Sequence, residues 1–189
     1  MPKKRKKQKA TMANPSLLVP LDGDKGKIIQ VVVETPKGSR NKYAFDEDQK
    51  VFALKKVLPA GMAFPYDFGF VPSTLGEDGD PIDVLVLMDE PAFPGVLLKC
   101  RIIGIIEGEQ GAKKFNERND RIVAIENENH SFADIQHVDD LGKEFLHELE
   151  DFFVNYHELS HEKYRVLGAK GPAAARKRLK IGMRAFKSR

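Results

Sequence analysis

Residues 76–87 read Gly-Glu-Asp-Gly-Asp-Pro-Ile-Asp-Val-Leu-Val-Leu, an acidic turn that runs directly into an apolar strand. The proline and glycines exclude a helix at the turn, and the apolar run that follows has the length of a strand. Side chains alternate across a strand, so Asp83 shares a face with Leu85 and Leu87. A carboxylate in that position is costly unless a charged partner meets it.

The same turn predicts a metal site. Asp78, Asp80 and Asp83 lie within six residues, and carboxylates packed this closely repel one another unless a cation neutralises them. Ligand sets made only of oxygen suit hard ions such as magnesium, calcium or manganese. An EF-hand loop does not fit, because Ile82 stands at a ligand position, Asp83 at the glycine and Asp89 at the final glutamate.

The chain around this turn predicts a sheet first and helices last. Segment 58–72 contains three prolines and two glycines among aromatic residues, which indicates an ordered, packed loop. Runs with strand length and β-branched or apolar content are residues 28–34, 42–45, 51–54, 82–88, 96–106 and 121–125. The order predicts an α+β protein with a β-barrel or strongly curved sheet, followed by packing C-terminal helices.

Two helices are expected near the C-terminus. Asp139 or Asp140 is a candidate cap for the first helix, and Pro172 suits the first turn of the second. The apolar stripe of the first helix is Leu141, Phe145, Leu149, Phe152 and Tyr156, and that of the second is Ala175, Leu179 and Met183 or Phe186.

Length and composition indicate one soluble domain. The 189 residues suffice for a single core, and no stretch approaches the roughly 18 consecutive apolar residues of a membrane helix. No secretory signal is apparent, and Cys100 is the only cysteine, so an internal disulfide is excluded. A cytoplasmic location is expected.

The charge is distributed unevenly along the chain. Of the 31 Lys and Arg residues, six lie in residues 1–13 and ten in residues 163–189, and neither segment contains an acidic residue. The segment between them holds the other 15 basic residues and all 28 acidic residues. Residues 1–15 are predicted to be a disordered basic arm and residues 16–189 one domain. An acidic body is unlike a duplex-binding domain, so nucleic acid is not the expected partner.

The motif DGDPID followed by VLVL resembles the signature of the soluble family I inorganic pyrophosphatases. Further similar segments are VVVETPKGSRNKY, LPAGMAFPYDFGFVPSTLGEDGDPIDVLVL, FPGVLLKCRIIGII and FFVNYHELSHEKY, which together span about residues 28–164. The resemblance implies an OB-like closed β-barrel, hydrolysis of pyrophosphate with Mg²⁺, and a homo-oligomer, with a hexamer favoured.

The resemblance also assigns roles to single residues. Asp78, Asp80 and Asp83 would form the core of the metal site, with Asp80 the acceptor of the attacking water's proton. Glu34 matches an outer active-site glutamate. Phosphate contacts would come from Lys42, Lys56, Arg121, Tyr156 and Lys163, with Lys42 and Tyr156 counted among the catalytic residues. Lysines and metal together would stabilise the leaving phosphate.

A fourth metal ligand is placed less directly. Alignment on residues 121–125 puts Asn119 at the family's ligand aspartate, whereas charge favours Asp120. Residues one apart on a strand face opposite ways, so both cannot serve alike. Asp120 is preferred, with Asn119 as the alternative, and Glu107 and Glu109 are further carboxylates for the same region.

The phosphate pocket differs from the usual family pattern. Ala44 replaces a glutamate, Lys56 an arginine, Phe64 and Phe68 tyrosines, and His157 a lysine. These changes motivate an alternative function, a catalytically impaired, metal-dependent phosphate-binding module. A third hypothesis, a nucleic-acid-associated protein with basic arms, ranks last.

Overall fold

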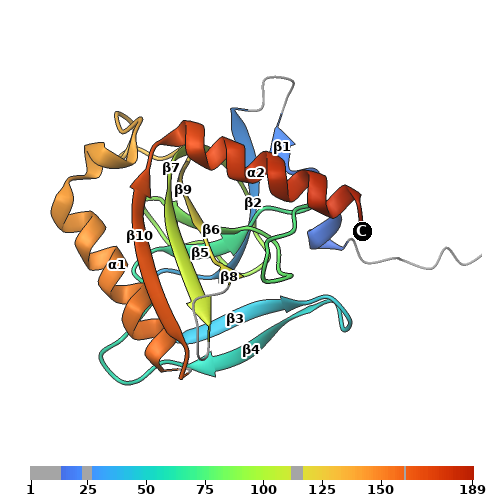
Figure 1. The fold of residues 1–189 in the computed structure, drawn as a ribbon, viewed down its shortest axis with the longest axis horizontal. Coiled ribbons are helices and arrows are strands. Elements are labelled where there is room, and N and C mark those ends of the chain that lie inside the picture. Colours follow the sequence, from blue (N-terminus) through green and yellow to red (C-terminus); the bar gives the residue numbers. More distant parts are fainter. Residues whose placement is uncertain (1–13, 23–26, 112–116, 160) are drawn as a thin grey trace, which may run out of the picture.

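The structure is a computed structural model that describes residues 14–22, 27–111, 117–159 and 161–189 (Figure 1). Most of the predicted basic arm, residues 1–13, lies outside the described residues. Asn14 caps the first described element, a short 3₁₀ helix, through its side chain. In order, the elements are η1 (Pro15–Leu17), β1 (Leu21–Asp22), β2 (Ile28–Thr35), β3 (Asn41–Asp46), β4 (Val51–Val57), β5 (Asp67–Phe70), β6 (Asp83–Leu87), β7 (Leu97–Gly111), β8 (Glu117–Arg118), β9 (Arg121–Glu126), η2 (Val138–Leu141), α1 (Lys143–Glu158), β10 (Lys163–Lys170) and α2 (Pro172–Lys187).

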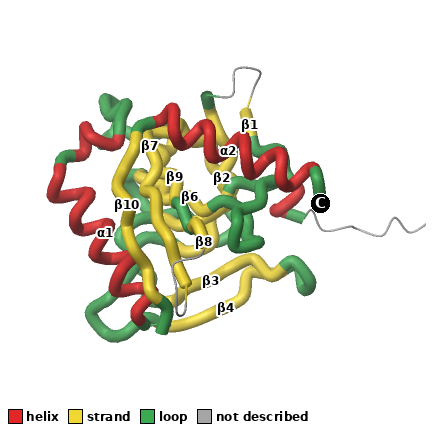
Figure 2. Tube along the Cα trace, in the orientation of Figure 1, coloured by secondary structure: helices red, strands yellow, loops and turns green. Residues whose placement is uncertain are grey.

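Most strands belong to one mixed sheet with the order β1-β2-β5-β6-β9-β7-β10. Only the β6 and β9 pair among these neighbours is parallel. The long strand β7 also pairs with β2, so the path β2-β5-β6-β9-β7 returns to its first strand. Strands β3 and β4 form a separate hairpin below this sheet (Figure 2). The predicted α+β class is confirmed.

Two apolar clusters fill the sheet-rich body because both faces of the central strands are covered. Val84 and Val86 of β6 belong to the cluster that packs against α2, whereas Leu85 and Leu87 belong to the cluster that packs against α1. The predicted alternation along β6 is therefore confirmed. Each fully buried aliphatic side chain of this kind contributes about 1.5 to 3 kcal/mol.

Three local predictions need correction. Segment 58–72 is not entirely loop, because Asp67–Phe70 forms β5 between β2 and β6. Strand β10 was not predicted, and its exposed alternate residues explain why its apolar content is low. Neither Asp139 nor Asp140 caps α1, since both lie in η2, which His137 caps, and α1 starts after Gly142.

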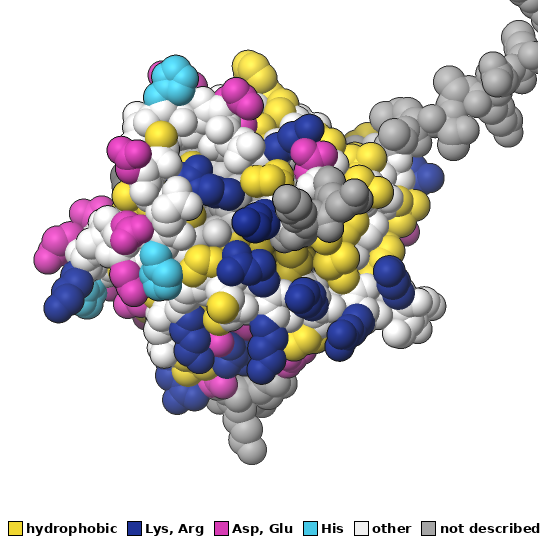
Figure 3. Space-filling view, turned by 90° about the horizontal axis from the view of Figure 1, so that it is seen from above, with side chains coloured by type: hydrophobic (Ala, Val, Ile, Leu, Met, Phe, Trp, Pro, Cys, Tyr) yellow, Lys and Arg dark blue, Asp and Glu magenta, His cyan; other side chains and the backbone are white. Residues whose placement is uncertain are grey.

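The α2 side of the molecule is basic. Figure 3 looks onto this side and shows Lys and Arg side chains spread across it. This is expected because residues 163–189, which include α2, contain ten basic residues and no acid. Within the described ranges, neither helix is long and apolar enough to cross a membrane.

Candidate active site

A cavity of about 820 Å³ opens between the acidic turn, the β3–β4 hairpin and the end of α1. Most of the residues singled out from the sequence line it, namely Glu34, Lys42, Lys56, Asp78, Asp80, Asp83, Asn119, Arg121 and Tyr156. Asp120 and Lys163 do not line this cavity. The fold therefore gathers residues from five strands, the acidic turn, the loop before β9 and helix α1 around one space.

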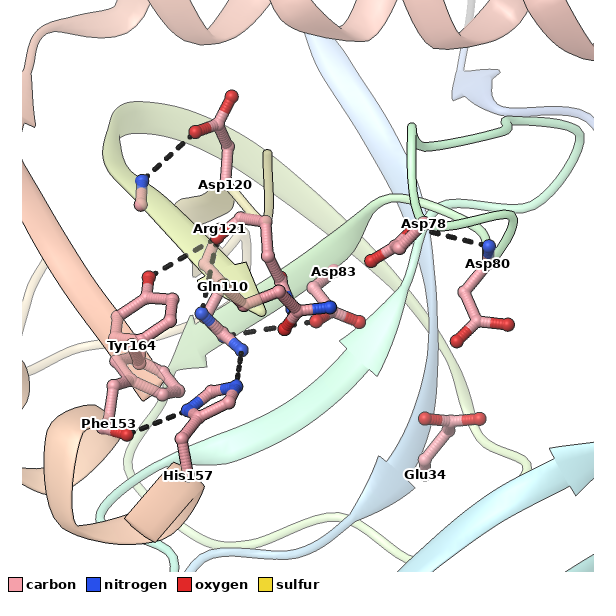
Figure 4. Close-up of polar contacts among 12 residues, drawn as sticks. Glu34, Asp78, Asp80, Asp83, Gln110, Asp120, Arg121, Phe153, His157 and Tyr164 are labelled. Carbon is pink, nitrogen blue, oxygen red and sulfur yellow. Dashed lines mark hydrogen bonds and ion pairs between the residues drawn. The ribbon is translucent and has the colours of Figure 1, made fainter. Parts of the chain in front are cut away.

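The acidic turn is shaped by its own backbone. Gly76 donates to the carbonyl of Asp80 over 2.7 Å, and the Asp80 amide donates to Asp78 Oδ1 over 3.2 Å. Gly79 has φ of +90°, a conformation that disfavours any residue with a Cβ. The turn thereby points Asp78 and Asp80 toward the cavity beside Asp83, as Figure 4 shows.

Asp83 occupies the first position of β6, next to charges of both signs. Removal from water raises the pKa of its carboxyl to about 7, with Glu34 and Asp78 adding to the rise and Arg121 and Lys42 opposing it. Its side chain keeps 24% exposure, which faces the cavity lined by these groups. A bound cation would favour the ionised form here and relieve this cost.

Glu34 connects β2 to the hairpin. One of its oxygens accepts the backbone N–H of Phe45 over 2.7 Å, and the other lies 3.4 Å from Lys42 Nζ. The Lys42 ammonium also lies 3.9 Å from the ring centre of Phe68 and 5.7 Å from that of Phe64. These phenyl rings offer no hydroxyl, but their faces attract the ammonium.

A second lysine and a tyrosine line the cavity next to Lys42. Lys56 Nζ lies 4.0 Å from the ring centre of Tyr156. Burial raises the pKa of the Tyr156 hydroxyl to about 12, so it remains a hydrogen-bond donor at neutral pH. The rings of Phe64 and Phe152 pack against Tyr156 and keep it at the cavity wall.

Arg121, at the start of β9, has a side chain with only 3% exposure. Its guanidinium carbon lies 4.1 Å from the ring centre of Phe153 and 4.8 Å from that of Tyr164. Its Nε lies 3.8 Å from Asp83 Oδ2, too far for a hydrogen bond. The guanidinium is therefore fixed on an aromatic surface beside the carboxylate cluster.

Asp120 points away from the large cavity. Its carboxylate accepts the Gly108 amide and pairs with Arg118 Nη2 at 2.8 Å and Arg178 Nε at 3.2 Å. Asn119 instead lines the cavity, where its amide donates to Gln110. The sequence favours Asp120 over Asn119 as a metal ligand. In the structure, however, the Asp120 carboxylate is already paired with two arginines.

A small hollow of about 10 Å³ lies behind the cavity wall and is lined by Asp78, Asp83, Asn119 and Asp120, with Arg118 and Arg178. Asp120 therefore borders the acidic turn from the far side. Glu107 pairs with Arg118 at 3.3 Å and Lys170 at 2.6 Å, and Glu109 pairs with Arg165 at 2.6 Å. Neither glutamate lines the cavity.

Several residues at this site were not predicted from the sequence. Gln110 lines the cavity, and Arg178 of α2 holds both Asp120 and Glu77. No local signal distinguishes Arg178 from the other basic residues of α2. The contact between the His157 ring and Arg121 was also not predicted from the sequence.

Comparison with known proteins agrees with this arrangement. A family model described as inorganic pyrophosphatase matches residues 31–187. The inorganic pyrophosphatase of Synechocystis sp. is 38% identical over 146 residues, which are 77% of this chain and 84% of that protein. The inorganic pyrophosphatase of Leifsonia xyli is 39% identical over 144 residues, 76% of this chain and 86% of that protein.

A crystal structure of inorganic pyrophosphatase from Thermus thermophilus superimposes with a TM-score of 0.84 at 32% sequence identity. The match covers 93% of this chain and 99% of that chain. The chain therefore belongs to the inorganic pyrophosphatase family of hydrolases.

Proposed function

We propose that this protein hydrolyses inorganic pyrophosphate to two orthophosphates with Mg²⁺ and a metal-activated water. The observation that carries the proposal is that one cavity holds both a carboxylate cluster and cationic groups. Asp78, Asp80 and Asp83 supply the carboxylates, and Lys42, Lys56, Arg121 and Tyr156 supply cationic or hydroxyl groups. This pattern suits a substrate of high negative charge that reaches the enzyme with a metal ion.

The residues present fit a hard divalent cation. Asp83 has a raised pKa because burial and the charges of Glu34 and Asp78 disfavour its ionised form. A magnesium ion held by Asp78, Asp80 and Asp83 would offset this repulsion, and oxygen ligands match its preference. When bound, magnesium lowers the pKa of a coordinated water and neutralises phosphate oxygens.

The other chemical roles are assigned to side chains of the protein. Asp80 takes the proton of the attacking water, whose oxygen bonds to one phosphorus. The bond between that phosphorus and the bridging oxygen breaks, and the bridging oxygen leaves with the other phosphate. Lys42, Arg121 and Tyr156 donate to phosphate oxygens and stabilise the charge on the leaving group. Lys56 and Lys163 add positive charge, with Lys56 on the cavity wall and Lys163 outside it.

Asp120 is proposed as the fourth metal ligand. The support for this assignment is the small hollow that Asp120 lines together with Asp78 and Asp83. Its pairing with Arg118 and Arg178 supports a second role, in which it anchors the acidic turn. Asn119 on the cavity side is the alternative oxygen donor.

The alternative function, a catalytically impaired phosphate-binding module, rests on Ala44, Phe64, Phe68 and His157. Phe64 and Phe68 pack around Lys42 and leave its ammonium at the cavity, so their exchange for tyrosine does not remove the cation. The comparisons give no support for an impaired module.

We further propose that residues 16–189 form one domain, with an OB-like closed barrel made by β2, β5, β6, β9 and β7. We also propose that the protein is a cytoplasmic homo-oligomer, with a hexamer favoured. The ring of strand pairings supports the barrel. Exposed apolar side chains such as Leu17, Val19 and Phe93 support association. Analytical ultracentrifugation of the purified protein tests the assembly.

Phosphate release from pyrophosphate, measured with Mg²⁺, without it and with a chelator, tests the main proposal. Turnover that requires the metal and saturates with pyrophosphate is expected. A folded protein that binds phosphate but releases none from pyrophosphate would instead identify the impaired module.

A further inference from the structure

The orientation of the Arg121 guanidinium is fixed by contacts on several sides. Its face lies against the rings of Phe153 and Tyr164, and its Nη1 donates to the carbonyl oxygen of Asn119 over 3.3 Å. Its Nη2 lies 3.4 Å from Nε2 of His157 (Figure 4). Both terminal nitrogens are therefore bound to the protein.

The His157 ring can act on Arg121 in only one protonation state. Its Nδ1 lies 2.8 Å from the carbonyl oxygen of Phe153, and because a carbonyl oxygen only accepts, Nδ1 must carry a hydrogen. In the neutral imidazole, Nε2 is then an acceptor and faces the Arg121 donor. The ring is 3% exposed and stacks on Tyr164 with centres 4.4 Å apart, so its orientation is held as well.

The surroundings of His157 favour that neutral state. Burial is the main reason that its pKa is lowered to about 4, and the charges of Arg121 and Lys56 lower it further, while the contact with Phe153 opposes them. A histidine in this environment is an uncharged acceptor at neutral pH. A lysine at position 157 would offer only donors to the arginine.

One of the three guanidinium nitrogens of Arg121, Nε, is not used by these contacts. Among the described residues, Arg121 Nε is buried and has no hydrogen-bond partner. It lies 3.8 Å from Asp83 Oδ2, on the side of the guanidinium that faces the metal carboxylates, and Arg121 lines the cavity. Leaving a buried donor unpaired is costly, so its partner is expected to arrive with the ligand.

We propose that His157 is a positioning residue whose unprotonated Nε2 holds the Arg121 guanidinium so that Nε is presented to an oxygen of the bound phosphate group beside Asp83. This inference rests on the proposed function, since it names how one substrate contact is oriented. It also explains why arginine at position 121 occurs together with histidine at position 157, because the arginine needs a hydrogen-bond acceptor there and histidine supplies one.

A structural role for His157 alone would affect stability and nothing specific to Arg121. The discriminating experiment is a double-mutant cycle of His157→Leu in the native and Arg121→Met backgrounds, with His157→Gln as the conservative variant. The glutamine amide can donate to Phe153 and accept from Arg121. His147→Gln, an exposed histidine on the same helix, is the matched control.

Two quantities are measured for each protein: kcat and KM for pyrophosphate, and the affinity for inorganic phosphate by titration calorimetry. His157→Leu is expected to lose about tenfold in kcat/KM and in phosphate affinity, a size typical of a charge-assisted contact. His157→Gln should recover most of the loss. In the Arg121→Met background, His157→Leu should cause little further loss.

Equal losses in both backgrounds, or a glutamine variant as impaired as the leucine one, would overturn the proposal. If His157→Leu does not fold, ¹⁵N NMR of the wild-type imidazole decides instead. A hydrogen on Nδ1 and a bare Nε2 at pH 7 is expected, and a protonated Nε2 refutes the proposal. A wild-type protein without pyrophosphate turnover would refute the proposed function. In that case, the phosphate affinities and the NMR spectrum would still test whether His157 positions Arg121.

Discussion

Arg178 Nε lies 3.2 Å from the carboxylate of Asp120 and thereby joins α2 to the residue that precedes β9. Both side chains are largely buried, with 13% and 4% exposure. The same arginine reaches Glu77 in the acidic turn at 3.1 Å. The C-terminal helix is therefore linked by one side chain to Asp120 and to the acidic turn.

Arg178→Met should destabilise the fold by about 1.5 to 3 kcal/mol, because it removes a charged hydrogen-bond partner from the buried Asp120 while Arg118 remains. Urea unfolding measures the change. Glu77→Gln is the matched control, since that carboxylate is 55% exposed and its pairing should contribute less than about 1 kcal/mol. Similar effects from the two variants would mean that the Asp120 contact contributes little.

Asp83→Asn should lower Mg²⁺-dependent turnover by about a hundredfold or more, because it removes a carboxylate from the proposed metal site. The fold should persist, since asparagine has nearly the same shape and ends the repulsion from Glu34 and Asp78. Turnover and circular dichroism are measured on the same samples. Wild-type activity in this variant would contradict the metal assignment.

Lys42→Ala should cost at least about tenfold in kcat/KM, more than Lys56→Ala. The Lys42 ammonium is held between Glu34 and the Phe68 ring, so it is already oriented at the cavity. Lys56 lies over the Tyr156 ring and replaces the usual two-pronged arginine with a point charge. Steady-state kinetics on both variants checks the order, and an unimpaired Lys42→Ala would refute the phosphate assignment.

His157 should make the folded protein sensitive to acid. Its pKa is about 4 in the folded state and near 6.5 when exposed, so the unfolded chain binds more protons between these values. The stability that neutral His157 contributes above pH 6.5 is therefore lost as pH falls toward 4, with a slope of at most about 1.4 kcal/mol per pH unit.

The test compares wild type with His157→Gln, so that contributions shared by the two proteins cancel. The difference in unfolding free energy between the two proteins should shift against wild type from pH 6.5 downward. Parallel curves across this range would show that the histidine is not held neutral.

Gly108→Ala should destabilise the protein by about 1 to 3 kcal/mol through overpacking. A Cβ there would lie 2.0 Å from the hydroxyl oxygen and 2.4 Å from the ring carbon of Tyr164. Thermal unfolding measures the loss. Adding Tyr164→Leu to Gly108→Ala should recover part of the stability if the clash is the cause, whereas additive losses would exclude it.

The sequence determined the carboxylate cluster of the site, because Asp78, Asp80 and Asp83 are close together in the chain. A turn with Gly79 and a strand with period two suffice to bring three carboxylates to one place, so their shared cavity could be predicted. The alternation of β6 between two apolar clusters followed from the same pattern.

The rest of the site depended on pairings between distant segments, which the residue pattern alone does not determine. Asp120 and Asn119 differ by one residue, and only the register of β9 and the approach of Arg178 from α2 decide which of them faces the cavity. Strand β10 and the contact between His157 and Arg121 also depend on such pairings. A charged or polar side chain acquires its partner from packing, and these partners come from elements far apart in the chain.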